Sequence, residues 1–170
     1  MIQLRLTQKV QKAAGIPAKQ LVAVSETKLG LGSWTVNLFI QNRRKVLIFV
    51  NEKTLYSFVL TGIRKEHYTK LPECFGLGLL KLLEGDGFTE KQIAFLIAGV
   101  DQVSYTKTNS RKVLGTVNDL VWHYQHSITS GGGLEQADIG GIMQRVNRMP
   151  QKNLEWSYAI DAVRAIAKSA

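Results

Sequence analysis

The chain has 170 residues, the size of one domain, and 45% of them are hydrophobic, which is enough for a single packed core. It carries 22 Lys and Arg against 13 Asp and Glu, and the formal net charge of +9 favours anionic partners such as nucleic acid, phosphorylated ligands or an acidic protein. A single cysteine excludes an internal disulfide and a cysteine zinc cluster, no apolar run is long enough to span a membrane, and charges near the start argue against a signal peptide, so we expect one cytoplasmic domain over residues 1–170.

The first third of the chain has mainly the patterns of strands. Alternating or β-branched and aromatic segments predict the strands, and a capped segment with a glycine stop predicts one helix. These elements are a strand at 2–6, a helix capped by Thr7 and ended by Gly15, and a hairpin of strands 34–40 and 45–50 around the turn 41–44. Asn51 ends the hairpin and can cap a short turn over 52–54, and the apolar segment 55–60 fits a strand or a helix.

After Gly62 the spacing of apolar residues is mostly helical. The predicted helices are 65–83 with Pro72 in the first turn, 89–98 capped by Thr89, 113–128 ended by the glycines 131–133, 138–146 capped by Asp138, and 160–167; a strand is expected near 103–105 and an extended segment at 154–158. The order predicts an α+β fold: a small antiparallel or mixed sheet with a prominent hairpin at about 34–50, packed by four to five helices mainly in the C-terminal two thirds.

The stretch KTNSRKVLGTVNDL, residues 107–120, lies where the predicted strand ends and the next predicted helix begins. The first amides of a helix are unpaired and attract anions, and Lys107 and Arg111 flank that point. Thr108, Asn109 and Ser110 are all competent caps, while Gly115 suggests the close approach of a backbone segment, a side chain or a ligand. The alternative interpretation is a helix cap, a packing glycine and two solvated cations.

Further along this predicted helix, Asn118, Trp122 and His126 fall on a stripe that flanks the apolar one. Trp122 can offer a stacking surface to a base or a partner, or it can seal the edge of the core. His123 and His126 have a spacing that a metal ion could use, but no third ligand is near them in sequence. No phosphate-binding glycine motif occurs, and no Asp precedes Asp86 to begin a nuclease-type metal site, so neither a metal nor another cofactor is expected.

Several segments together resemble a family of small bacterial proteins known only as a domain of unknown function. They are M-I-Q-L-R-L-T-Q-K, W-T-V-N-L, V-N-E-K-T-L, T-N-S-R-K-V-L-G-T-V-N-D-L and R-V-N-R-M-P. This chain has Lys112 and Met149 where the family usually has Ser and Thr. The resemblance brings no activity, but it implies a shared fold and a shared site of Asn37, Asn51, Lys107, Thr108, Arg111, Asn118 and Asn147.

Three functional hypotheses follow. The first is a binding protein for nucleic acid, RNA rather than DNA, or for another phosphate-bearing ligand, since amides pair with base edges and cations hold phosphates. Its ligand-binding residues are Lys107, Thr108, Asn109, Arg111, Asn118, Asn147, Asn51, Asn37 and Trp122, and its further nucleic-acid contacts are Arg43, Arg44, Lys45, Lys112, Arg145 and Arg148.

The second hypothesis is a metal-independent, toxin-like ribonuclease. In it Arg111 or Lys107 would stabilise charge on the phosphate, and His123 or His126 would transfer the proton. The third is a protein-interaction module, such as an antitoxin, an immunity protein or a regulatory partner, with Trp122 and the basic faces against an acidic surface.

Overall fold

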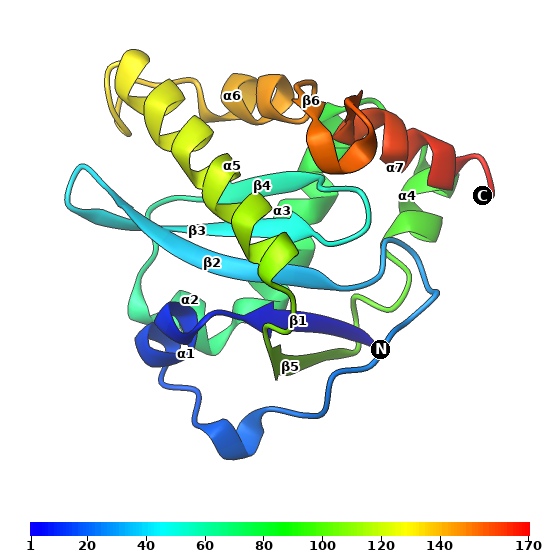
Figure 1. Cartoon of the computed structure of the whole chain (residues 1–170), viewed down its shortest axis with the longest axis horizontal. Coiled ribbons are helices and arrows are strands. Elements are labelled where there is room, and N and C mark those ends of the chain that lie inside the picture. Colours follow the sequence, from blue (N-terminus) through cyan, green and yellow to red (C-terminus); the bar gives the residue numbers. More distant parts are fainter.

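The computed structural model describes residues 1–170 and contains a five-stranded mixed sheet with helices on both faces (Figure 1). The strand order is β4-β3-β2-β1-β5. Strand β1 lies between β2 and β5 and is parallel to both, whereas β2, β3 and β4 form an antiparallel meander. The strands are β1 (Ile2–Leu6), β2 (Trp34–Gln41), β3 (Arg44–Asn51), β4 (Ser57–Leu60) and β5 (Val103–Lys107). The predicted α+β class, with a mixed sheet, is confirmed.

The hairpin is tighter than its sequence suggested. Asn42 and Arg43 have φ angles of 49° and 63°, so they form a two-residue turn in the left-handed region that matches the twist of the flanking strands. Gln41 and Arg44 therefore pair with each other as the last residues of β2 and the first of β3. The turn therefore consists of Asn42 and Arg43 alone, two residues fewer than the predicted turn over 41–44.

Seven α-helices surround the sheet, where four to five were expected. They are α1 (Gln8–Ala14), α2 (Lys65–Thr69), α3 (Leu71–Gly85), α4 (Glu90–Leu96), α5 (Arg111–Ser130), α6 (Ile139–Val146) and α7 (Ala159–Ala167). The expected continuous helix over 65–83 is wrong: it breaks at Lys70, because Pro72 has no amide hydrogen to extend a helix from the preceding turn. The predicted caps Thr7, Thr89 and Asp138 each accept a backbone amide.

The segment between α6 and α7 is a small hairpin rather than one extended stretch. Strand β6 (Pro150–Gln151) pairs with β7 (Ser157–Tyr158), and the 3₁₀ turn η2 (Lys152–Leu154) lies between them. A second such turn, η1 (Ala18–Gln20), follows α1. No helix combines the length and the apolar composition needed to cross a membrane.

Each face of the sheet has its own apolar core. On one face an aromatic cluster, with Trp34 and Phe75 at 5.3 Å and Phe49 and Phe58 at 4.8 Å between ring centres, packs with residues of α1, α3, α4 and α7. On the other face α5 and α6 cover Phe39, Val46, Ile48, Val50 and Val59. In Figure 1, α5 crosses in front of the sheet and α3 lies behind it.

The face beneath α5 changes from apolar to polar toward β1. Side chains alternate along a strand, and Ile2, Leu4 and Leu6 belong to the opposite core, so Gln3 and Arg5 face the α5 side. Register puts Arg5 beside Thr35 of β2 and Thr106 of β5. These polar residues are nevertheless buried, and the site described next lies over them.

Candidate functional site: the Arg5 pocket

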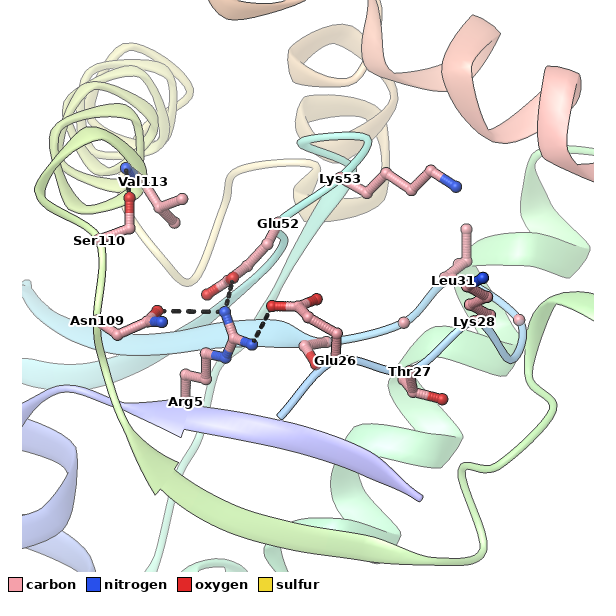
Figure 2. Close-up of a pocket in the computed structure, with 13 residues that line it drawn as sticks. Arg5, Glu26, Thr27, Lys28, Leu31, Glu52, Lys53, Asn109, Ser110 and Val113 are labelled. Carbon is pink, nitrogen blue, oxygen red and sulfur yellow. Dashed lines mark hydrogen bonds and ion pairs between the residues drawn. The ribbon is translucent and has the colours of Figure 1, made fainter. Parts of the chain in front are cut away.

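A polar pocket of about 410 Å³ lies over the buried polar face of β1 and β2, and we call it the Arg5 pocket (Figure 2). Four segments build it: β1, the loop before β2, the turn after β3, and the start of α5. Only two of its lining residues are hydrophobic. The lining comprises Arg5, Glu26, Thr27, Lys28, Gly30, Leu31, Gly32, Ser33, Glu52, Lys53, Asn109, Ser110 and Val113.

The guanidinium of Arg5 occupies the centre of this pocket, between Glu52 and Glu26, as Figure 2 shows. Its side chain is only 3% exposed. Nη1 donates to the carboxylate of Glu52 and, at 3.2 Å, to Oδ1 of Asn109. Nη2 donates to Oε1 of Glu26 at 2.9 Å and to the carbonyl of Ser25 at 3.2 Å. The single buried positive charge is therefore paired with two carboxylates, which more than balance it.

The two carboxylates are not equivalent. The side chain of Glu52 is 15% exposed, and its Oε1 also accepts a hydrogen bond of 2.6 Å from Thr35, so it is fixed. The side chain of Glu26 is 82% exposed and has only Arg5 as a partner among the hydrogen bonds of the structure. Glu26 is therefore the less firmly held of the two carboxylates, because it is hydrated and has no second partner.

Two buried polar atoms in the pocket have no hydrogen-bond partner in the protein: Nε of Arg5 and Oγ of Ser33. Buried polar groups are nearly always paired, because an unpaired one loses its hydration without compensation. Both residues line the same pocket, although these two atoms lie beneath its surface.

Asn51 holds two walls of the pocket together. Its side chain is fully buried, and Nδ2 donates to the carbonyls of Leu31 at 2.7 Å and Ser33 at 3.3 Å. Its Oδ1 accepts from the backbone amides of Lys53 and Thr54, which caps the predicted turn over 52–54. Asn51 was predicted to bind a ligand; the structure instead uses its amide to position the loop and the turn that do line the pocket.

The start of α5 supplies the remaining wall. Ser110 is the N-cap, and its hydroxyl accepts the amide of Val113 at 3.2 Å. Of the predicted residues in this stretch, Asn109 reaches the pocket through its contact with Arg5. Lys107 and Thr108 precede the wall and Arg111 and Lys112 follow it, but none of these four lines the cavity.

Two other predicted asparagines are buried structural groups. Asn37 accepts a hydrogen bond of 2.9 Å from the hydroxyl of Thr7, the cap of α1. Asn147 accepts the amide of Ser57 at 2.9 Å and donates to its carbonyl at 2.8 Å, so its side chain acts as a strand partner for the outer edge of β4. The structure does not bring Asn37 or Asn147 to the Arg5 pocket.

The other predicted cations lie away from this pocket. Arg43, Arg44 and Lys45 are at the tip of the hairpin, where Arg44 forms an exposed pair with Glu135. Arg145 is exposed on α6. Arg148 pairs at 3.1 Å with Asp86, whose buried carboxylate also accepts the hydroxyl of Tyr56.

Gly115 and Asn118 are both exposed on α5. A β-carbon added to Gly115 would meet nothing within 4 Å, so no backbone or side chain of the protein approaches this glycine closely. Arg111 and His123 are twelve residues apart on one helix, which at 1.5 Å per residue is about 18 Å. The helix therefore does not bring the predicted phosphate-binding cation and proton carrier to one phosphodiester.

Trp122 and His123 line a second pocket, on the side of α5 that faces the β6–β7 hairpin. His126 stacks on Trp122 with ring centres 5.1 Å apart. No group of three or more His, Cys, Asp or Glu side chains is placed to hold a metal ion.

Sequence reasoning missed the residues at the centre of the site: Arg5, Ser33 and Glu52. In the sequence Arg5 alternates with apolar residues, which is the ordinary pattern of a strand with one solvent face. The burial of Arg5 could have been inferred from the number of predicted helices, because four to five helices are enough to cover both faces of a small sheet. An arginine in such a strand then becomes buried and needs acidic partners.

The class of protein is thus an α+β domain with a polar, cation-centred pocket between β1, the loop before β2, the turn after β3 and the start of α5. A family model described as Domain of unknown function (DUF6933) matches residues 3–162, and the chain belongs to this family. No curated protein matches the sequence.

Proposed function

We propose that this protein binds a phosphate-bearing ligand in the Arg5 pocket. The observation that carries the proposal is the guanidinium of Arg5, whose Nη2 donates at 2.9 Å to a carboxylate, that of Glu26, that is itself 82% exposed. Nε of Arg5 and the hydroxyl of Ser33, which lines the same pocket, are buried without a partner. An arginine offers a planar fork of donors to a phosphate, and a serine hydroxyl can donate to a further oxygen.

The electrostatics of the pocket favour an anion. Its lining has three cations, Arg5, Lys28 and Lys53, against two carboxylates, Glu26 and Glu52. The start of the 20-residue helix α5 forms one wall and adds the partial positive charge of its first amides. The net charge of +9 acts over a longer range and attracts the same kind of ligand.

In this proposal Glu26 competes with the ligand. A phosphate group that enters the pocket replaces the Glu26 carboxylate on Nη2 of Arg5, while Glu52 stays in place and keeps the guanidinium oriented. The displaced Glu26 carboxylate, already 82% exposed, is hydrated by solvent, and the phosphate takes over its charge beside the buried guanidinium.

The ligand class that fits best is RNA or a nucleotide derived from it. A basic protein of this size gains most from a polyanion, and an accessible phosphate at a chain end or loop can enter a pocket that duplex phosphates cannot reach. Arg111 and Lys112, which are exposed beside the pocket wall, would then contact neighbouring phosphates.

The test compares Glu26→Gln with Glu135→Gln. Both replace a glutamate that pairs with an arginine, at 82% and 81% exposure, and both change the net charge by the same amount. Calorimetric titration with inorganic phosphate and with a 5′-phosphorylated RNA hexamer should show about two- to fivefold tighter binding for Glu26→Gln alone. Ser33→Ala should weaken binding.

Equal affinities for the two glutamine variants would show that the anion does not compete with Glu26, and the proposed site would be wrong. Absence of phosphate and RNA binding at low salt, where electrostatic binding is strongest, would overturn the function itself.

A further inference from the structure

A second pocket, of about 380 Å³, lies between α5 and the β6–β7 hairpin, and we call it the tryptophan pocket. Trp122 of α5 and Trp156 of the hairpin both line it. These are two of the most exposed large hydrophobic side chains of the protein, at 58% and 65%. More than half of the surface of each tryptophan is left uncovered by the protein, so both offer flat apolar surface beside one cavity.

The backbone of the hairpin holds Trp156 in this position. Glu155 and Trp156 have consecutive left-handed φ angles of 53° and 67°, a conformation that costs energy for residues other than glycine. The amide of Trp156 donates to the carbonyl of Gln151 at 2.8 Å, which closes the hairpin. The side chain of Asn153 donates to Thr116 of α5 at 2.6 Å, which fastens the hairpin to the helix.

Trp122 is supported from its own helix. The ring of His126 stacks on the indole, with an angle of 4° between the planes, and His126 is not part of the pocket lining. The ring of His123 meets the indole edge-on at 85°. Both histidines restrict the rotation of Trp122, so the indole is held ready for a ligand rather than ordered by it.

The polar residues of the lining fit the edge and the backbone of a nucleotide. Asp119 can accept hydrogen bonds from an exocyclic amino group, and Gln151 can pair with a base edge. Lys152 can hold the adjacent phosphate. The net charge of +9 favours this polyanion over a neutral sugar, which tryptophans can also bind.

We propose that the tryptophan pocket binds a base of a single-stranded nucleic acid by stacking on Trp122 and Trp156. Aromatic side chains bind single strands in this way with little dependence on sequence, because every base has a flat face. A duplex does not expose the faces of its bases, so it would not enter. The site does not depend on the Arg5 pocket, since the two share no lining residue.

The test uses the full chain and a fluorescently labelled adenine hexamer of RNA without a terminal phosphate. Trp122→Ala and Trp156→Ala should each weaken binding about 5- to 150-fold in a polarisation titration, and Trp122→Phe should retain most of the affinity. Leu77→Ala is the control: Leu77 is 60% exposed, but it lies on α3 away from this pocket, and the change should leave the affinity unaltered.

Quenching of intrinsic fluorescence gives a second readout. The third tryptophan, Trp34, is fully buried, so quenching by the hexamer reports on Trp122 and Trp156. Failure of the hexamer to quench, equal binding of a matched duplex, or preferential binding of a neutral glucan oligosaccharide would each overturn the inference. Phosphate binding in the Trp122→Ala variant should stay as in the wild type, which keeps this result separate from the test of the Arg5 pocket.

Discussion

Asn147→Ala should destabilise the protein strongly without touching a ligand site. The Asn147 side chain is completely buried, and its amide makes two hydrogen bonds, at 2.9 and 2.8 Å, with the backbone of Ser57. Ser57 belongs to β4, which is the edge strand of the sheet, so no neighbouring strand can take over these bonds. The sequence alone placed Asn147 among the ligand-binding residues, and the structure predicts a different consequence of its loss.

The magnitude follows from the two backbone groups that lose their partner. A buried donor or acceptor that is left unpaired costs about 1–3 kcal/mol, so the free energy of unfolding should fall by about 2–6 kcal/mol. Domains of this size have a free energy of unfolding of about 5–15 kcal/mol, so the variant should lose a large fraction of its stability. Asn118→Ala, at an exposed position on α5, should change stability by less than about 0.5 kcal/mol.

Urea unfolding followed by circular dichroism measures both variants, and a phosphate titration at low temperature measures the Asn147→Ala protein that remains folded. We expect a lower midpoint for Asn147→Ala and an unchanged affinity per folded molecule. A variant that unfolds within about 1 kcal/mol of the wild type and yet loses phosphate binding would refute the structural role of this amide.

Two further predictions concern stability. Gly115→Ala should raise the free energy of unfolding by about 0.5–1 kcal/mol, because the position is an exposed helix interior with open space for a β-carbon; a lower melting temperature would mean that something does approach this glycine. Burial raises the pKa of Tyr105 from its ordinary value of 10.0 to about 12, so its neutral form is favoured by folding, and the stability that this gives is complete below pH 10 and is lost as the pH rises toward 12. Tyr105→Phe should therefore flatten the alkaline loss of stability, and parallel urea-midpoint curves for the two proteins between pH 9 and 11.5 would contradict this.

Most of the fold could be predicted because its signals are local. Thr7 caps α1 and Gly15 ends it. Asp86 and Gly87 follow the end of α3, and Thr89 caps α4. Each of these signals depends only on a few neighbouring residues. The hairpin of β2 and β3 has the β-branched content of strands, and only the exact turn residues differed. The parallel pairing of β1 with both β2 and β5 could not be predicted, because it joins segments about 30 and 100 residues apart that have no shared pattern.

The candidate site was predicted only at one wall. The strand-to-helix junction near Asn109 and Ser110 does border the pocket, since a cap sequence is visible locally. The centre was not predicted, because the burial of Arg5 depends on a loop and a turn from elsewhere in the chain closing over β1. The asparagines were assigned to a ligand for the same reason: an amide that binds a ligand and an amide that ties two backbone segments have the same sequence signature.

Both proposed sites depend on the same helix. Val113 lines the Arg5 pocket and Thr116 lines the tryptophan pocket, and three residues of helix separate them by about 4.5 Å along the axis. The cap of α5 places its first amides at the proposed phosphate site, and the next turns carry Asp119 and Trp122 to the proposed stacking site. A single strand of a few nucleotides is long enough to reach from one pocket to the other, whereas a mononucleotide phosphate would occupy the first alone. In the two proposals together, Arg5 and the tryptophans, rather than the lysines and arginine at the start of α5, are the groups that select the ligand.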